Sequence, residues 1–191
     1  MVVKFGGANK ALARRGDYWN KQLFNGSGID IGGGHDSIAE AGYDAYNWDL
    51  KDGDAQYLAG VKPNTYDFVH SSHCLEHMVD PDIALENWIR VCKPKGYITI
   101  VIPDEELYEH NSWPSSFNSD HKWSFRMYKR GKKLPRSIDL LDFLKRHCIP
   151  CELIKLERIE AGFDWNLPLY VDQTARPPYA ECSIEFILRK K

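Results

Sequence analysis

The 191-residue chain has no long hydrophobic run and no excess of charge of either sign. Its longest apolar stretch, near residues 98–102, is far shorter than a membrane span, and the residues after Met1 lack the apolar segment of a secretion signal. Lysine and arginine number 25 and aspartate and glutamate 27, so no basic field is present to hold a polyanion. We therefore expect a cytoplasmic protein without a membrane span, acting on a small molecule and not on nucleic acid.

Cysteine is also scarce. Five cysteines scattered over this length do not resemble the framework of a disulfide-stabilised secreted domain, and most of them are expected to be buried thiols. Cys148 and Cys151 have the Cys-x-x-Cys spacing, but they follow the carboxyl end of an expected helix. Redox pairs place the first thiol at a helix N-terminus, so a redox or zinc role is the weaker interpretation of this pair.

What the chain does have is a run of three glycines directly after a buried-strand pattern. Residues 28–31 are largely apolar around Asp30, and Gly32–Gly34 follow at once. Glycines let the backbone turn sharply and let a ligand lie against bare peptide. A dinucleotide would place its diphosphate over such a turn, but the Asp30 carboxylate would oppose that anion. The same carboxylate would attract the ammonium and sulfonium groups of S-adenosylmethionine.

The hydrophobic pattern predicts strands that alternate with helices. Helices are expected at residues 8–24, 37–41, 81–91 and 137–147, the last of them capped by Ser137. Strands are expected at residues 29–31, 43–50, 55–61, 66–72, 97–102, 151–158 and 183–188. This order implies a Rossmann-like, doubly wound α/β fold: a mostly parallel seven-stranded sheet with a C-terminal antiparallel strand and an insertion after strand five.

The order and spacing of these segments resemble the class I S-adenosylmethionine-dependent methyltransferases, in particular a small bacterial type-11-like group whose fourth strand ends in Ser-His-x-Leu-Glu-His. The matching segments are residues 30–34, 53–55, 66–77, 85–96 and 97–103. The resemblance implies S-adenosylmethionine as the cofactor and methyl transfer as the reaction. It also favours an oxygen acceptor on a surface-glycan precursor, of capsule or lipopolysaccharide, or on its phosphorus-containing modifier.

We treat residues 1–191 as one domain in four parts. They are a leading helix (1–27), a cofactor-binding core (28–103), a substrate-side insertion (104–136) and a C-terminal helix with strands (137–191). The insertion is polar, rich in aromatic residues and too long for an ordinary connector, which indicates a functional segment. Within it, the basic run at residues 129–133 could contact a phosphate, although a solvated loop is the favoured interpretation.

The resemblance also implies individual cofactor contacts. Asp30 and the glycine backbone would meet the amino acid part, Asp49 would take the ribose hydroxyls, and Asp54 would accept from the adenine amino group. The complete expected set is Asp30, Gly32, Gly33, Gly34, Asp49, Asp54, Ala55 and Ser71.

The chain departs from the family pattern at two points. Asp36 stands where glycine is common, which would narrow the methionine end of the pocket, and Asp52 is an alternative to Asp49.

Methyl transfer is an in-line displacement that needs an acceptor lone pair near the methyl group, and a base helps when the acceptor is a hydroxyl. The candidate catalytic residues are His121, His73 and His77, and the candidate substrate contacts are Asp104, Tyr108 and Trp123. His121 could accept a proton as a neutral imidazole, or it could be a lid histidine packed on Trp123. His77 or Glu76 could instead bond a backbone group.

Three alternatives complete the interpretation. The spacing of His70, His73 and His77 could suit a metal, but His70 lies inside an expected strand, so we assign no metal ion. The chain could be a non-catalytic cofactor-binding module that kept the fold. It could also be an NAD-dependent oxidoreductase, although Ser37 stands where the dinucleotide fingerprint has glycine. The oligomeric state is not predicted.

Overall fold

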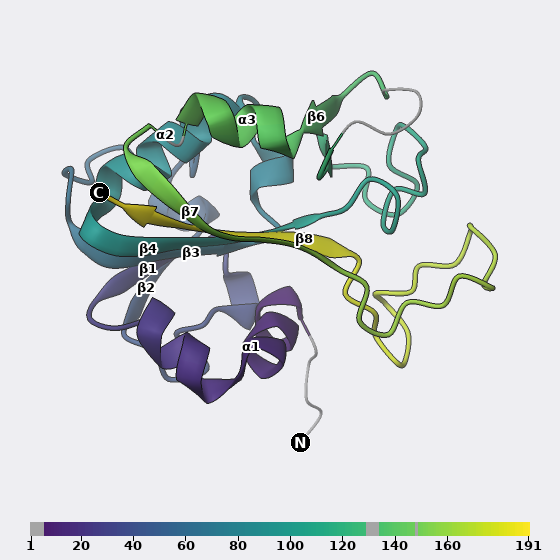
Figure 1. Ribbon diagram of the computed structural model, residues 1–191, viewed down its shortest axis with the longest axis horizontal. Coiled ribbons are helices and arrows are strands. Elements are labelled where there is room, and N and C mark those ends of the chain that lie inside the picture. The colour runs from purple at the N-terminus through teal and green to yellow at the C-terminus, as the bar shows by residue number, and fades with distance from the viewer. Residues whose placement is uncertain (1–5, 129–133, 148) are drawn as a thin grey trace.

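A computed structural model describes residues 6–128, 134–147 and 149–191 (Figure 1). Its main sheet has six strands in the order β2-β1-β3-β4-β8-β7. The strands are β1 (Gly28–Ile31), β2 (Ala45–Trp48), β3 (Tyr66–Ser72), β4 (Cys92–Pro103), β7 (Cys151–Ile159) and β8 (Ser183–Lys190). The first four run parallel, and β8 lies antiparallel between β4 and β7. The expected mostly parallel sheet with a C-terminal antiparallel strand is confirmed.

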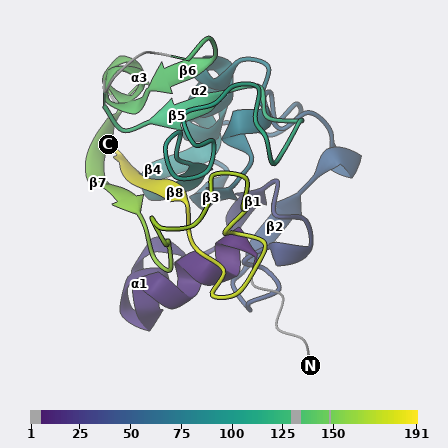
Figure 2. The same cartoon turned by 90° about the vertical axis from the view of Figure 1, so that its right-hand side faces the viewer.

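Helices cover both faces of this sheet. Helix α1 (Gly7–Leu23) packs on one face, and α2 (Pro81–Val91) and α3 (Leu140–His147) pack on the other (Figure 1). Three short 3₁₀ turns, η1 (Gly34–Asp36), η2 (Leu50–Asp52) and η3 (Leu75–His77), follow β1, β2 and β3. A small parallel pair, β5 (Ser124–Arg126) with β6 (Ser137–Asp139), lies on the side of α2 and α3 (Figure 2).

Strand β4 has side chains buried on both faces. Ile98, Ile100 and Ile102 are fully buried in the larger core with Trp88 of α2. On the other face, between the sheet and α1, a smaller core contains Leu23, Phe24, Ile38, Phe68 and Ile187. A strand covered on both faces needs an almost continuous apolar sequence, which explains the run that precedes Pro103.

The structure differs from the predicted pattern in two ways, and the first removes the seventh strand. Residues 55–61 form turns, because the N–H groups of Tyr57 and Leu58 bond back to the Asp54 carbonyl, and Leu58 has a positive φ. Leu58 is fully buried, so its apolar character reflects packing and not a strand. The described part of the chain therefore has a six-stranded main sheet, not a seven-stranded one.

The second difference concerns helix positions. The segment at residues 37–41 forms turns after η1, not the predicted helix. Helix α3 begins at Leu140, because Ser137 lies in β6 and pairs with Ser124 instead of capping the helix.

Three further expectations concern the cysteines, the basic run and membrane-spanning helices. The four cysteines that the structure describes, Cys74, Cys92, Cys151 and Cys182, are buried, as expected. Cys148 and the basic run at residues 129–133 lie outside the described residues, so their predicted roles stay predictions. Over the ranges that are described, no helix is long and apolar enough to cross a bilayer.

Candidate active site

The glycine turn after β1 requires a glycine at its first position, Gly32. Gly32 has φ +74°, and a Cβ there would lie 2.6 Å from the Cys74 sulfur, so this position requires glycine. The turn therefore brings bare backbone to the carboxyl end of β1.

Asp30 lies beneath this turn with no exposed surface. Its Oδ2 accepts hydrogen bonds from Ser37 Oγ at 2.7 Å and from the Ile38 N–H at 2.8 Å, and its Oδ1 lies 2.7 Å from His70 Nδ1. Burial alone would raise the pKa of Asp30, but His70 and these hydrogen bonds outweigh it and lower the pKa. Both oxygens are engaged by protein groups, so Asp30 anchors the loop from beneath.

A cavity of about 600 Å³, called the cofactor cavity below, opens beside the turn. Four of the predicted cofactor residues line it, namely Gly32, Asp49, Asp54 and Ala55. The other four, Asp30, Gly33, Gly34 and Ser71, do not line it. Ser71 is buried, and its hydroxyl donates to the Ile31 carbonyl at 3.0 Å, so it joins β3 to β1.

Asp49 and Asp52 differ in what their carboxylates do. They form a reciprocal capping box on η2, in which the Asp49 side chain accepts from the Asp52 N–H and Asp52 Oδ2 accepts from the Asp49 N–H. Asp49 Oδ1 also accepts from the Leu50 N–H. The second oxygen of Asp52 accepts from the Tyr46 hydroxyl at 2.6 Å. Asp49 Oδ2 instead points toward Gly34, 3.8 Å from where a Cβ of that residue would stand. Asp49 is therefore the better placed of the two predicted ribose acids.

A second cavity, of about 290 Å³ and called the acceptor cavity below, lies next to the first. His73, His77, Tyr108 and His121 line it, so all three predicted catalytic histidines meet there. His73 and His77 also line the cofactor cavity. These two side chains therefore form the boundary between the two spaces.

The remaining predicted substrate contacts lie elsewhere. Asp104 is buried at the start of the insertion, where its Oδ1 accepts from the N–H groups of Glu106 and Leu107, and burial raises its pKa to about 6. Trp123 packs against the main core and donates from its ring N–H to the Val79 carbonyl. Neither residue lines the acceptor cavity.

Backbone hydrogen bonds bring His121 to η3. The Glu76 carbonyl accepts from the N–H groups of Lys122 and Trp123, at 2.9 and 3.2 Å, and Lys122 Nζ donates to the His77 carbonyl. The His121 ring packs edge-on against His77, with centroids 4.9 Å apart. The His121 ring also lies against the Tyr108 ring, with centroids 5.4 Å apart.

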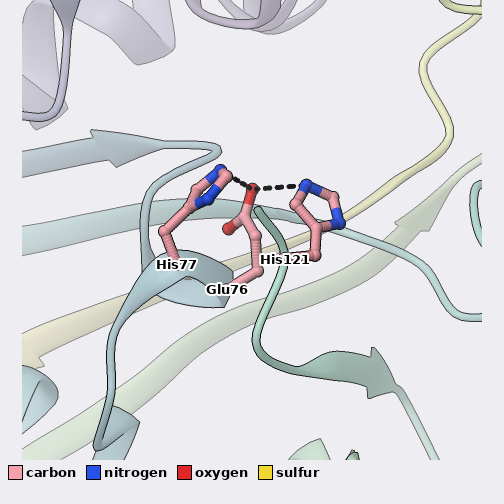
Figure 3. Close-up of side chains that lie close together, drawn as sticks. All are labelled: Glu76, His77 and His121. Atoms are coloured by element: carbon pink, nitrogen blue, oxygen red, sulfur yellow. Dashed lines mark ion pairs between the residues drawn. The ribbon is translucent and has the colours of Figure 1, made fainter. Parts of the chain in front are cut away.

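Glu76 lies at the centre of the histidine cluster (Figure 3). Its side chain has no exposed surface, and neither carboxylate oxygen has a hydrogen-bond partner. Oε1 lies 3.7 Å from His73 Nδ1, 3.8 Å from His77 Nε2 and 3.9 Å from His121 Nε2. Burial raises the pKa of this carboxyl to about 7.

His73 is held in an unusual conformation at this junction. It has φ +54°, and a Cβ on Gly7 would lie 2.4 Å from its Cδ2, so the start of α1 packs directly on the imidazole. Burial, together with the neighbouring His121, lowers the pKa of His73 to about 4. The imidazole is therefore neutral at pH 7. His70, by contrast, lies inside β3 against Asp30, so the three-histidine metal set considered from spacing does not form.

Asp36 connects the glycine turn to α1. Gly6 has no side chain to cap the helix, and Asp36 accepts from the Ala8 N–H at 2.7 Å and from the Asn9 side chain. Asp36 lines neither cavity, so the expectation that it narrows the cofactor site is wrong.

Several residues of the acceptor cavity were not predicted as site residues. They come from the start of α1, from the insertion and from the segment before β8, and include Gly6, Gly7, Lys10, Asn118, Glu181 and Ser183. Their sequence neighbourhoods carry no motif, so no local signal marks them. Glu109 was also missed. Its Oε1 lies 2.7 Å from His121 Nδ1.

The fold is that of a Rossmann-like α/β protein, with two adjoining cavities that share His73 and His77. A family model described as a methyltransferase domain matches residues 8–143. The chain belongs to this methyltransferase family, and S-adenosylmethionine is its cofactor. A search of curated proteins finds no match.

Solved structures share the fold. An S-adenosylmethionine-dependent methyltransferase from Archaeoglobus fulgidus has 20% identity and a TM-score of 0.55, with 97% of this chain and 95% of that chain covered. A protein from Bacillus halodurans C-125 described as a methyltransferase has 16% identity and a TM-score of 0.52, with 91% and 96% covered. A structure of the Haloferax volcanii Trm112 methyltransferase activator in complex with a methyltransferase has 14% identity and a TM-score of 0.54, with 86% and 82% covered. At these identities the likeness establishes the fold alone.

Proposed function

We propose that this protein transfers the methyl group of S-adenosylmethionine to a hydroxyl oxygen of a small polar acceptor. The observation that carries the proposal is that His73 and His77 line both the cofactor cavity and the acceptor cavity. A methyl donor on one side of these imidazoles and an acceptor on the other would be held next to each other. Holding two reactants in this way supplies a large part of the rate of such a displacement.

The cofactor cavity suits the donor. In this proposal Asp49 accepts from the ribose hydroxyls, Asp54 accepts from the adenine amino group beside Ala55, and the bare backbone at Gly32 receives the amino acid part. All four residues line the cavity, which supports these roles. When bound, S-adenosylmethionine supplies an electrophilic methyl group on a sulfonium. Asp30 contributes from beneath by fixing the turn.

The acceptor cavity suits a hydroxyl-rich molecule. Its lining combines imidazoles with the Tyr108 ring, the Asn118 amide and the Lys10 side chain, so hydrogen-bond donors and acceptors stand next to an aromatic surface. We carry forward a surface-glycan precursor, or its phosphorus-containing modifier, as the narrower proposal for the acceptor. His121 is the group we propose for activating the hydroxyl, because Glu109 holds its Nδ1 and leaves Nε2 facing Glu76.

Calorimetry with S-adenosylmethionine and with its demethylated product tests the first half of this proposal. Saturable binding of both is expected, and folded protein that binds neither would end the proposal. Incubation with sugar, sugar-phosphate and amine acceptors, followed by mass spectrometry, tests the second half. A gain of one methyl group on a hydroxyl acceptor is expected. Cofactor binding without turnover on any acceptor would instead indicate the non-catalytic module.

A further inference from the structure

The histidine cluster surrounds a buried carboxyl group that no lysine or arginine among the described residues pairs with. Glu76 is fully buried with both oxygens unpartnered, and among the described residues it forms no ion pair with a lysine or arginine. Buried carboxylates are normally hydrogen-bonded, paired with a cation or bound to a metal, because an unpaired one is costly. Three imidazoles, of His73, His77 and His121, each have a nitrogen within 4 Å of Glu76 Oε1.

The donor atoms are spaced as metal ligands are. One ligand atom each from Glu76, His77 and His121 lie within 4.8 Å of one another. Figure 3 shows both imidazoles directed at the same carboxylate oxygen, at 3.8 and 3.9 Å. A tetrahedral ion with bonds of about 2.1 Å keeps its ligand atoms about 3.4 Å apart. Each carboxylate–imidazole distance would therefore shorten by about half an ångström around an ion, and the two imidazole nitrogens, which lie within 4.8 Å of each other, by at most about 1.4 Å.

The other nitrogen of each imidazole is held by a carboxylate. His121 Nδ1 lies 2.7 Å from Glu109 Oε1, and His77 Nδ1 lies 3.0 Å from Asp120 Oδ2. Metal-binding histidines characteristically have such a partner on the nitrogen that faces away from the ion, because it fixes the tautomer and the ring orientation. Both Nε2 atoms are thereby left to face Glu76.

We propose that Glu76, His77 and His121 bind one divalent transition-metal ion whose open coordination positions face the acceptor cavity. Two imidazoles and one carboxylate suit zinc, iron, cobalt or manganese, whereas magnesium and calcium prefer oxygen ligands alone. Three protein ligands leave a coordination position open for a substrate. Catalytic metal sites have such an open position, whereas structural sites are closed by four protein ligands. All three residues line the acceptor cavity.

This inference deepens the proposed function, on which it rests, by restricting the acceptor to a hydroxyl that can bind the ion. A coordinated hydroxyl loses its proton to water more readily, because the cation stabilises the oxyanion. The oxyanion then forms a bond to the methyl carbon while the carbon–sulfur bond breaks, and that electron pair stays on sulfur. The products are a methyl ether and the neutral demethylated cofactor. In this scheme His121 activates the hydroxyl by holding the cation, and the proton goes to water.

Metal binding is measured first, on protein stripped with a chelator and dialysed. Titration with Co²⁺, followed by visible absorption, and with Zn²⁺, followed by calorimetry, is expected to show one ion per chain. Glu76→Gln and His121→Ala should each weaken binding about 100-fold, and Glu109→Gln, in the outer shell, about 10- to 100-fold. His147→Ala is the matched control, because His147 is a buried histidine that pairs with Asp82 and lines neither cavity.

Binding of S-adenosylmethionine to each variant serves as the check on folding, since none of the changed residues is in the predicted cofactor set. The proposal is overturned if the wild type binds no ion, or if folded Glu76→Gln and His121→Ala bind as tightly as the control. If the ion is absent but the cofactor binds and a hydroxyl is methylated, this inference alone fails. If folded protein does not bind the cofactor, the proposed function fails.

Discussion

Asp30 Oδ1 lies 2.7 Å from His70 Nδ1, and neither side chain has any exposed surface. The pair joins β1 to β3 at the base of the glycine turn, where Asp30 and His70 are also register partners. With the bonds from Ser37 and Ile38, the carboxylate connects two strands to the segment that follows the turn. The Asp30 carboxylate therefore fixes the glycine turn beside the cofactor cavity but does not line that cavity.

Removing this carboxylate should affect stability first. Asp30→Ala leaves His70, Ser37 and the Ile38 N–H without their buried acceptor, so we expect the free energy of unfolding to fall by about 3 kcal/mol. Denaturant unfolding measures the change. The exposed Asp44 provides the control, and Asp44→Ala should change the free energy by less than about 0.5 kcal/mol. Equal stability of the two variants would contradict the anchoring role.

Asp49 should act on cofactor affinity. Asp49→Ala and Asp52→Ala each remove one half of the same capping box, and Asp52→Ala also removes the acceptor of the Tyr46 hydroxyl, so a local loss of stability does not favour Asp49→Ala as the weaker binder. Only Asp49 lines the cofactor cavity. Loss of a hydrogen bond to a charged group costs about 1.5–3 kcal/mol, so Asp49→Ala should raise the Kd of S-adenosylmethionine about 10- to 100-fold more than Asp52→Ala does. Calorimetry measures the Kd of both variants, and equal values would contradict the assignment of Asp49 to the ribose hydroxyls.

His121 should act on turnover. It lines the acceptor cavity but not the cofactor cavity, so His121→Ala should lower kcat about 100-fold or more while the Kd of the cofactor stays nearly unchanged. A methyl-transfer assay and calorimetry on the same preparation give the two numbers. Loss of cofactor binding in folded His121→Ala would overturn the assignment. His147→Ala should leave both numbers near the wild-type values.

The periodic elements were predictable because their signals are local. The predicted bounds of β3 and α2 agree with the structure, and α2 begins where Asp80 caps it through the N–H groups of Asp82 and Ile83, with Pro81 at its first position. The segment at residues 55–61 was mispredicted as a strand because its apolar residues serve packing, and periodicity alone does not distinguish a buried turn from a short strand.

The site was predictable only in part, because its chemistry depends on contacts between distant segments. The sequence places His77 beside Glu76, but nothing local shows that the insertion returns His121 to the same point. Glu109, which orients that histidine, is equally remote from any motif. The acidic residue before the glycines was assigned a direct electrostatic role, whereas tertiary structure surrounds it with protein donors.

We expect the buried carboxylate of Glu185 to make the stability of the protein depend on pH. It is fully buried on β8 between Arg14 and Arg15 of α1, at 2.8 and 2.7 Å, and Lys155 of β7, at 2.9 Å. Burial alone would raise the pKa of this carboxyl, but Arg15, Arg14 and Lys155 lower it to about 2.

Because the folded pKa lies below the unfolded value of about 4.3, the ion pairs stabilise the protein fully above that pH and less as the pH falls toward 2. We expect this carboxylate to contribute roughly 3 kcal/mol of the stability lost over that window. Denaturant unfolding at pH 6, 4 and 3 should show a shallower decline in Glu185→Gln than in the wild type, although that variant is less stable at pH 6. Parallel profiles would show that Glu185 does not supply the pH dependence.

Asp36 should affect the acceptor side through α1. Its carboxylate caps α1, whose N-cap Gly6 and first-turn residues Gly7 and Lys10 line the acceptor cavity but not the cofactor cavity. Loss of a helix cap costs about 1 kcal/mol, so Asp36→Ala should lower Tm by about 2–4 °C and raise the KM for the acceptor while the Kd of the cofactor is unchanged. Asp36→Asn keeps an oxygen for the Ala8 N–H and should restore both quantities. A change in cofactor Kd with an unchanged acceptor KM would instead place Asp36 on the cofactor side.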